Sequence, residues 1–143
     1  MILHKRKIVL YTTLLIGSFL IIGSCTKAND TSVPFIFFLK NNGYVYADDT
    51  LGKNITINVG VVTYPANIKN TLTKLTEVVT YDNTTDEQLS NIHIPAQSNT
   101  MSDSFASIYS ITTRNISGDE KYTFTVTDTN GNSNSIKLSL HIN

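Results

Sequence analysis

Two runs of alternating apolar and polar residues near the C-terminal end constrain the fold more than any other feature of this chain. The apolar members are Tyr122, Phe124 and Val126 in the first run and Ile136, Leu138, Leu140 and Ile142 in the second. Successive side chains of a β-strand point to opposite faces, so each run predicts a strand with one buried face. Asn130-Gly131 lies between the runs and is typical of a tight hairpin turn. The end of the chain therefore predicts an antiparallel hairpin.

The chain between residue 35 and this hairpin also favours strands. It is rich in Thr, Asn, Ser, Ile and Val, which favour strands and the turns between them. Shorter apolar or alternating runs predict strands at 35–39, 54–64, 72–81, 89–94 and 105–111, with an extended edge segment at 44–46. Glu77 interrupts the apolar side expected for 72–81. Because this part of the chain has no helical period, we predict an all-β fold, an antiparallel β-sandwich of about seven strands.

The segment from Gly118 to Asn132 also resembles a known pattern. Its sequence, GDEKYTFTVTD followed after one residue by NGN, resembles the F–G hairpin of bacterial immunoglobulin-like domains. The resemblance implies an immunoglobulin-like sandwich over residues 35–143, in which Tyr122 occupies the corner position and Phe124 a core position. Such domains serve adhesion, glycan binding, spacing and enzyme accessory roles, so the pattern indicates a fold and leaves the function open.

The N-terminal segment predicts export from the cytoplasm. Lys5-Arg6-Lys7 precedes an uncharged apolar run from Ile8 to Ile22. As a helix, the 15 residues of this run would measure about 22 Å, which is short of the ~30 Å hydrocarbon core of a bilayer. A basic start, a short apolar middle and a small-residue end define a secretory signal. We therefore expect residues 1–24 to be a signal peptide that forms an N-terminal signal helix.

The end of this signal, Ile22-Gly23-Ser24-Cys25, resembles the lipobox of bacterial lipoproteins. The resemblance implies cleavage before Cys25, a diacylglyceryl thioether on its sulfur, and anchoring in the lipid bilayer. Thr26 stands where an Asp would retain such a protein at the inner membrane, which favours the outer membrane of a Gram-negative bacterium. Residues 25–34 would then be the lipidated Cys and a flexible polar tether. The alternative is an uncleaved N-terminal helix in which the cysteine is incidental.

Charge and cysteine content exclude several classes of protein. Without residues 1–24 the eleven basic residues fall to eight, against eleven acidic ones, and Arg114 is the one arginine left. Such a chain lacks the basic patch that phosphates need, so we expect no nucleic-acid partner. Cys25 is the single cysteine, and its acylation would leave no thiol for a disulfide or a metal.

The sequence contains no recognisable catalytic motif, since it has neither G-x-S-x-G nor H-E-x-x-H. Asp128, Asn130 and Asn132 are spaced like part of a calcium loop, but the glycine and the final glutamate of such a loop are out of place. The alternation puts His93 and His141 on solvent-facing sides, and no third ligand accompanies them. We therefore predict no catalytic residue, no metal site and no cofactor.

Three tyrosines are the remaining candidates for ligand binding. Tyr44, Tyr46 and Tyr64 fall near the ends of predicted strands, where their rings would stack on a sugar or a protein. The alternative is that they are edge tyrosines partly buried against the sandwich. The leading hypothesis is a membrane-anchored, non-enzymatic surface module for binding or adhesion, whose partner is a glycan or an envelope protein. The second hypothesis is a structural accessory subunit of an envelope or outer-membrane transport complex, with no ligand of its own.

Overall fold

The computed structural model describes residues 32–95 and 104–143, all within the compact unit Thr31–Asn143. The strands are β1 (Phe35–Phe38), β2 (Asp49–Leu51), β3 (Thr56–Tyr64), β4 (Leu72–Tyr81), β5 (Thr85–His93), β6 (Phe105–Thr112), β7 (Gly118–Asp128) and β8 (Ser133–Ile142). In the described ranges, no helix is long and apolar enough to cross a membrane. The predicted signal helix and Cys25 lie outside the described residues, as does the tether up to residue 31.

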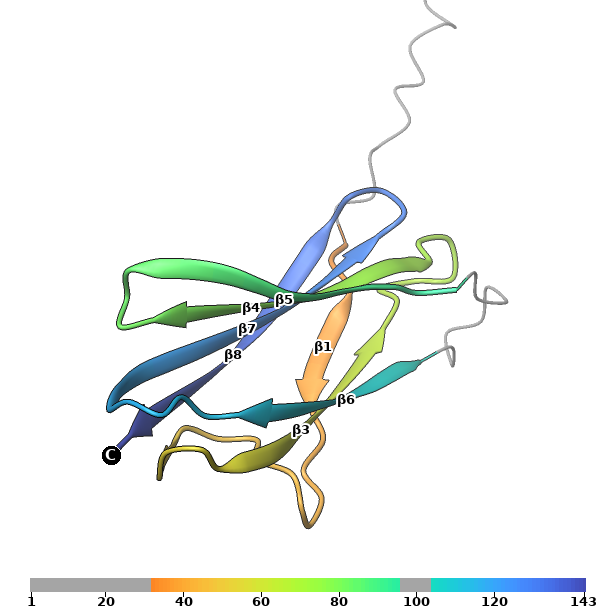
Figure 1. Cartoon of the computed structure of the whole chain (residues 1–143). Helices are drawn as coiled ribbons and strands as arrows, with labels where there is room; N and C mark the ends of the chain where they lie inside the picture. The colour runs from red at the N-terminus through yellow and green to blue at the C-terminus, as the bar shows by residue number, and fades with distance from the viewer. Residues whose placement is uncertain (1–31, 96–103) are drawn as a thin grey trace, which may run out of the picture. The chain divides into compact units, whose positions relative to one another are not determined.

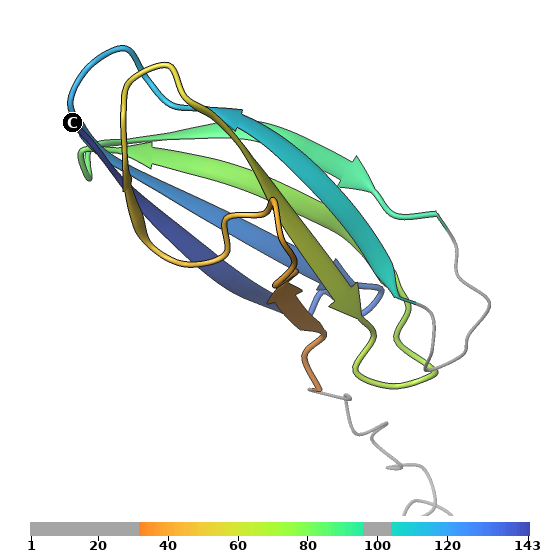
Figure 2. The same ribbon diagram turned by 90° about the horizontal axis from the view of Figure 1, so that it is seen from below.

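The strands form two sheets packed face to face (Figure 1, Figure 2). The smaller sheet has the order β1-β3-β6 and the larger has the order β2-β8-β7-β4-β5. Only the β4–β5 and β7–β8 connections stay within one sheet, and every other connection between the described strands crosses from one sheet to the other. The fold is therefore an all-β, immunoglobulin-like sandwich, which confirms the predicted class.

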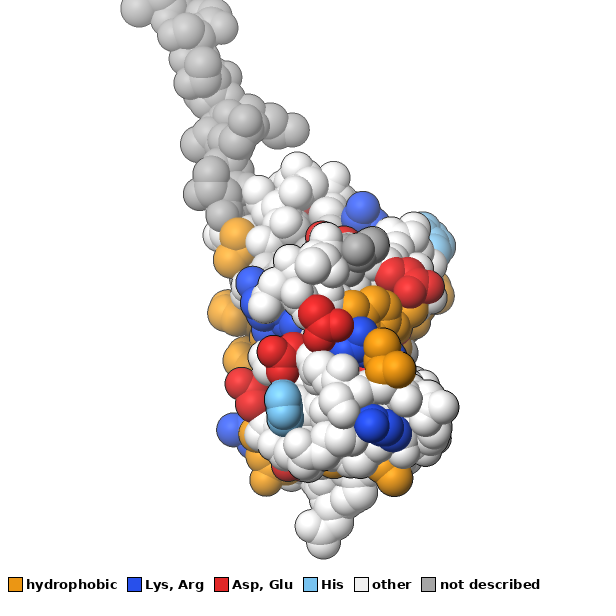
Figure 3. Space-filling view, turned by 60° about the vertical axis from the view of Figure 1, so that its left-hand side comes forward, with side chains coloured by type: hydrophobic (Ala, Val, Ile, Leu, Met, Phe, Trp, Pro, Cys, Tyr) orange, Lys and Arg blue, Asp and Glu red, His pale blue; other side chains and the backbone are white. Residues whose placement is uncertain are grey.

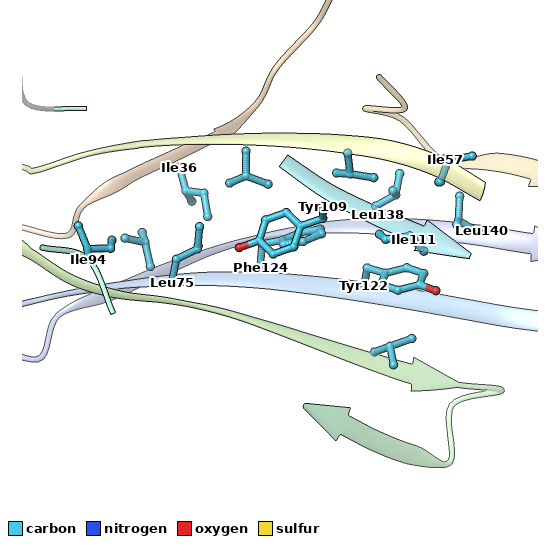
Figure 4. Close-up of a cluster of buried hydrophobic side chains, with 14 of the residues drawn as sticks. Ile36, Ile57, Leu75, Ile94, Tyr109, Ile111, Tyr122, Phe124, Leu138 and Leu140 are labelled. Atoms are coloured by element: carbon cyan, nitrogen blue, oxygen red, sulfur yellow. The ribbon is translucent and has the colours of Figure 1, made fainter. Parts of the chain in front are cut away.

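The core lies between the sheets and is centred on Phe124 of β7 (Figure 4). The Phe124 side chain is fully buried, and its ring contacts Tyr109 of β6 at 4.9 Å and Phe38 of β1 at 5.9 Å between centroids. Aromatic contacts of this kind add about 0.5–1.5 kcal/mol to the burial itself. Phe124 thus joins the two sheets, and it occupies the core position that the resemblance implied.

The predicted C-terminal hairpin is confirmed, but Asp128 rather than the Asn-Gly pair organises its turn. The loop has four residues, and the Asp128 N–H donates to the Asn132 carbonyl at 3.0 Å. The Asp128 carboxylate accepts the N–H groups of Asn130 and Asn132, both at 2.9 Å. Within this loop only Gly131 has a positive φ, of 83°, so the turn is not the two-residue type that needs two such residues.

Three local expectations differ from the structure. Glu77 was expected to interrupt a buried side, yet it points into the core and is 5% exposed. Residues 44–46 were expected to be an extended edge, yet they lie outside every strand. The edge of the larger sheet is instead β2, which pairs in parallel with β8. This pairing also makes the sandwich eight-stranded and not wholly antiparallel. The sequence did not predict β2, because a strand of three residues is too short to show an alternating pattern.

Candidate binding face

The three tyrosines selected from the sequence do not lie on one surface. Tyr44 and Tyr46 lie in the loop between β1 and β2, where the Val45 N–H donates to the Asn58 carbonyl at 2.8 Å. Tyr64 is the last residue of β3, so about 20 Å of strand separates it from Asn58. Tyr44 is half-buried and Tyr46 is 45% exposed. Tyr64 therefore belongs to a different surface from the other two.

That surface is the outer side of the smaller sheet. In β1 the buried Ile36 points into the core, so Phe35 and Phe37 point outward. The register places Phe35 beside Tyr64 and Phe37 beside Val62. The outward apolar side chains of the sheet and of the residue after β1 form one surface, which we call the apolar face: Phe35, Phe37, Leu39, Val62, Tyr64, Ala106 and Ile108.

The aromatic part of the apolar face is open to solvent. Phe35 and Phe37 are 49% and 52% exposed, and their rings are stacked with centroids 6.4 Å apart. Ile108 of β6 is 60% exposed, more than any other large apolar side chain in the described residues. Contiguous exposed apolar side chains are uncommon on soluble domains and mark binding surfaces.

Gly60 shapes the centre of the apolar face. A Cβ atom at Gly60 would lie 2.9 Å from both Cβ and Cδ1 of Leu39, which is closer than carbon atoms approach. The Leu39 N–H also donates to the Gly60 carbonyl at 2.8 Å. The missing side chain thus lets Leu39 pack closely against Gly60 of β3, whose register partner on β6 is Ile108.

No charged side chain lies on the outer side of the three strands of the smaller sheet. Beyond the apolar face, this side carries Thr and Ser residues and Asn58, and the hydroxyls of Thr56 and Thr112 are hydrogen-bonded at 2.9 Å. A partner can therefore cover this side without taking a charge out of water, which would be costly. Sequence reasoning missed the face, although the Phe35-Ile36-Phe37-Phe38 run was a signal, because an edge strand that is apolar on both sides must expose one of them.

A side chain of the larger sheet fixes the start of β1. The Asn134 Nδ2 donates to the Pro34 carbonyl at 3.0 Å, and Pro34 itself is buried. This bond ties the residue before β1 to β8, 100 residues further along the chain. The outward-pointing Phe35 and Phe37 of β1 are therefore held in place by the sandwich.

A second candidate surface is an open acidic groove along β2, β8 and the start of β7. The groove has a volume of about 450 Å³, and its lining includes His141 and the charged residues Asp48, Asp49, Asp119, Glu120 and Lys121. His141 Nδ1 lies 2.8 Å from Asp119 Oδ1, and Asp48 accepts the Ser139 N–H at 2.8 Å. Figure 3 shows a face of the molecule on which acidic side chains gather near a histidine.

In the described residues, the acidic groove contains neither a hydrogen-bonded Ser–His pair nor a cluster of three metal-ligating side chains. Ser139 lines the groove near the His141–Asp119 pair, but in the described structure its hydroxyl makes no hydrogen bond to the imidazole. Within residues 32–95 and 104–143 no three His, Cys, Asp or Glu side chains come together as metal ligands. His93 is exposed at the end of β5, and the Asp128 carboxylate is occupied by its own turn.

Arg114 has a structural role beside this groove. Its guanidinium donates to both Asp82 oxygens, at 2.9 and 3.2 Å, and to Glu120 Oε1 at 3.2 Å. It also lies over the Tyr81 ring, 4.7 Å from the centroid. The hydrogen bonds from Arg114 hold the pKa of Asp82 below its usual value. Arg114 thus ties the β4–β5 turn to the start of β7.

Glu120 and Tyr122 form the inner part of the same network. The Tyr122 hydroxyl donates to Glu120 Oε2 at 2.7 Å, and Glu120 is 1% exposed. Burial, and then the bond to the Glu120 carboxylate, raise the pKa of Tyr122. In the corner of immunoglobulin-like domains the tyrosine hydroxyl bonds to the backbone. Here the same position bonds to a side chain, so the corner is built around the carboxylate.

Comparisons with known proteins support the fold. No protein-family model matches the chain, and no curated protein matches it. A superoxide reductase (neelaredoxin) from Ignicoccus hospitalis has a similar structure, with a TM-score of 0.53 at 5% identity over 78% of this chain and 80% of its own. A variant of that superoxide reductase matches with a TM-score of 0.52 at 9% identity over 84% of this chain and 86% of its own.

A third similar structure is a Niemann-Pick type C2 protein from the Japanese carpenter ant. It covers 66% of this chain and 79% of its own at 5% identity, with a TM-score of 0.41 that supports no argument. At such identities the two superoxide reductase structures show the fold alone. The chain is thus similar in fold to β-sandwich proteins, and its function has to be inferred from its own surfaces.

Proposed function

We propose that this chain is a lipid-anchored, non-enzymatic binding module of a bacterial cell envelope, and that it holds its partner on the apolar face. The observation that carries the proposal is the exposed, stacked pair Phe35 and Phe37, which continues through Tyr64 and Val62 to Ile108. A surface of this kind is stabilised when a partner covers it.

The anchor in this proposal is Cys25 with its acyl chains, held in the outer membrane of a Gram-negative bacterium. Two or more acyl chains hold a protein stably on a bilayer. Phe35 lies ten positions after Cys25, so the tether reaches at most about 35 Å when fully extended. The apolar face would then stay close to the membrane surface, where it can contact other envelope proteins.

The chemistry of the apolar face favours a protein partner over a glycan. Sugar sites combine an aromatic ring with polar groups that bond to the hydroxyls, whereas the aromatic end of this face carries only apolar neighbours. Centres of protein interfaces are similarly aromatic and poor in charge. This observation also supports the alternative, a structural accessory subunit that has no ligand of its own and docks onto an envelope or outer-membrane transport complex.

The anchor is tested by fatty-acid labelling. Cells that express the wild type should incorporate radioactive fatty acid into the protein, and the Cys25→Ser variant should incorporate none. A wild type that takes up no label and fractionates as a freely soluble protein would overturn the anchor.

The binding face is tested by photo-crosslinking in the native envelope. A photoreactive phenylalanine analogue at Phe37 should give one discrete crosslinked product, and the same analogue at exposed Lys137 on the outer side of β8 should give none. Tyr46→Ala serves as the glycan control and should leave any retention on a polysaccharide array unchanged. Equal products from Phe37 and Lys137 would refute the assignment of the face, whatever the outcome of the labelling.

A further inference from the structure

The described strands form two sheets with four edge strands, and three of these are protected from pairing with another chain. A bare sheet edge presents unpaired N–H and C=O groups to any extended chain, so natural sheets shorten it, charge it or bend it. The edges β1 and β2 are short, with four and three residues. The edge β5 carries Asp86 and Glu87, and a bulge at Leu89 shifts its register with β4.

The fourth edge, β6, has none of these devices. Its eight residues, FASIYSIT, contain no charge, no proline and no glycine. Its register with β3 is regular from Thr56↔Thr112 to Thr63↔Phe105. In the described structure β3 is its one strand partner. Alternate backbone groups along the other side of β6 therefore lack a strand partner within the described part of the chain.

We propose that β6 pairs antiparallel with β6 of a second copy of this chain, which joins two smaller sheets into one six-stranded sheet. A two-fold pairing brings each side chain close to its own copy or to a near neighbour in sequence. An uncharged strand tolerates this, because no like charges meet across the axis. The edge β5 is less suited to such a pairing, because Asp86, Glu87 and the bulge at Leu89 oppose the addition of another strand. We therefore take β6 as the edge suited to self-association.

The alternation of β6 limits the possible registers of this pairing, and the exposure of Ile108 selects one of them. Ile108 and Ala106 point outward, whereas Tyr109 and Ile111 are buried. Pairing Ile108 with Ile108 of the second copy keeps outward side chains on one side of the joined sheet. It also covers the most exposed large apolar side chain of the described residues. Both apolar faces then lie on the same side, because the two-fold axis of an antiparallel pair is perpendicular to the sheet.

The pairing goes beyond the proposed function and does not require the lipid anchor. If the anchor is present, both copies are confined to one membrane surface, which raises their effective concentration. Even a weak contact between two strand edges would then form dimers when the cell contains little of the protein. The joined sheet would present two apolar faces to one partner or to one surface.

Disulfide trapping in the full chain tests the pairing. In the proposed register the two Ile108 Cα atoms lie about 4.5–5.5 Å apart, within the reach of a disulfide. Two Phe37 residues would lie five strand spacings apart, at least about 24 Å. Mild oxidation of membranes should therefore give roughly tenfold more disulfide-linked dimer with Ile108→Cys than with Phe37→Cys. The reason is that the pairing keeps only the first two thiols next to each other, which gives them a high effective concentration.

Sedimentation of the purified full chain in mild detergent gives an independent readout. The wild type and Phe37→Lys should be dimers, whereas Ile108→Lys should be a monomer with an unchanged circular dichroism spectrum. A monomeric wild type with equal crosslinking of the two cysteine variants would overturn the pairing. A dimer that Phe37→Lys dissociates and Ile108→Lys does not would also overturn it, because the apolar face would then be the interface. An unmodified Cys25, seen in the mass of the N-terminal peptide, would refute the anchor without affecting the sedimentation result. Because its free thiol could then form disulfides, the trapping would be repeated with Cys25→Ser in both cysteine variants.

Discussion

Replacing Arg114 with Met tests how strongly one cation stabilises the domain. Glu120 is 1% exposed, so in the variant its carboxylate stays buried without a cation. Removing one partner of a buried ion pair costs about 3–5 kcal/mol. The side chain of Arg114 is 17% exposed, and Glu120 keeps its bonds from the Arg114 backbone N–H and the Tyr122 hydroxyl. We therefore expect a loss at the low end of that range, about 3 kcal/mol.

Urea unfolding of the full chain in mild detergent, followed by circular dichroism, measures this loss. With a slope of about 1–3 kcal/mol per molar urea, the midpoint should fall by roughly 1–3 M. The matched control is Lys137→Met, which removes an exposed cation from the outer side of β8 and should change stability by less than about 0.5 kcal/mol. If the two variants have the same midpoint, the structural role of Arg114 is refuted.

A double variant and a pH series separate the two carboxylates that Arg114 contacts. Arg114→Met combined with Glu120→Gln should cost at least about 1 kcal/mol less than the sum of the single changes, because the groups interact directly. The pKa of Asp82 is lowered in the fold by Arg114, so the stability this pair contributes is present at neutral pH. It is lost as the pH falls through that lowered pKa. The Arg114→Met variant should lack this part of the acid sensitivity.

Three further changes test the core and the apolar face. Phe124→Ala should cost about 3–5 kcal/mol in urea unfolding, since it empties the site where two aromatic rings from the other sheet pack; a cost below about 1 kcal/mol would contradict the central role of this ring. Burial raises the pKa of Glu77, so its ionised form destabilises the fold as the pH rises through that pKa. Glu77→Gln should therefore stabilise the protein by about 1 kcal/mol at pH 7, with the gain shrinking toward pH 4, and equal stability at both pH values would argue against a desolvated carboxyl. Gly60→Ala should displace Leu39 and cost about 1–3 kcal/mol, whereas Ala106→Gly, a change of the same size at an exposed position of the same sheet, should cost about 1 kcal/mol or less; equal costs would contradict the close contact.

The strands were predictable because their signal is local. Buried and exposed positions alternate along β7 and β8 as the sequence predicted, and the limits of β4 agree with the expected 72–81. A two-residue period reports which side of a strand is apolar, so it predicts the strand and the class of fold. Glu77 was the exception, since a carboxyl in a buried row is tolerated only where the surrounding packing accepts it.

The candidate surfaces were much less predictable. Tyr64 was selected as one of three tyrosines, but its neighbours on the apolar face come from β1 and β6, up to 44 residues away along the chain. The Arg114 network likewise joins Asp82 and Glu120, which are 32 and 6 residues from it. Contacts of this range depend on which strands become neighbours, and alternation says nothing about strand order.

The sequence by itself determined that this chain forms a β-sandwich, because apolar and polar residues alternate along its strands and so distinguish an inner from an outer side. Only the tertiary structure decided which outer sides adjoin, which edges are protected and which is bare. The physical reason is that hydrophobic burial is recorded residue by residue along a strand, whereas sheet order is set by the joint packing of all the strands at once.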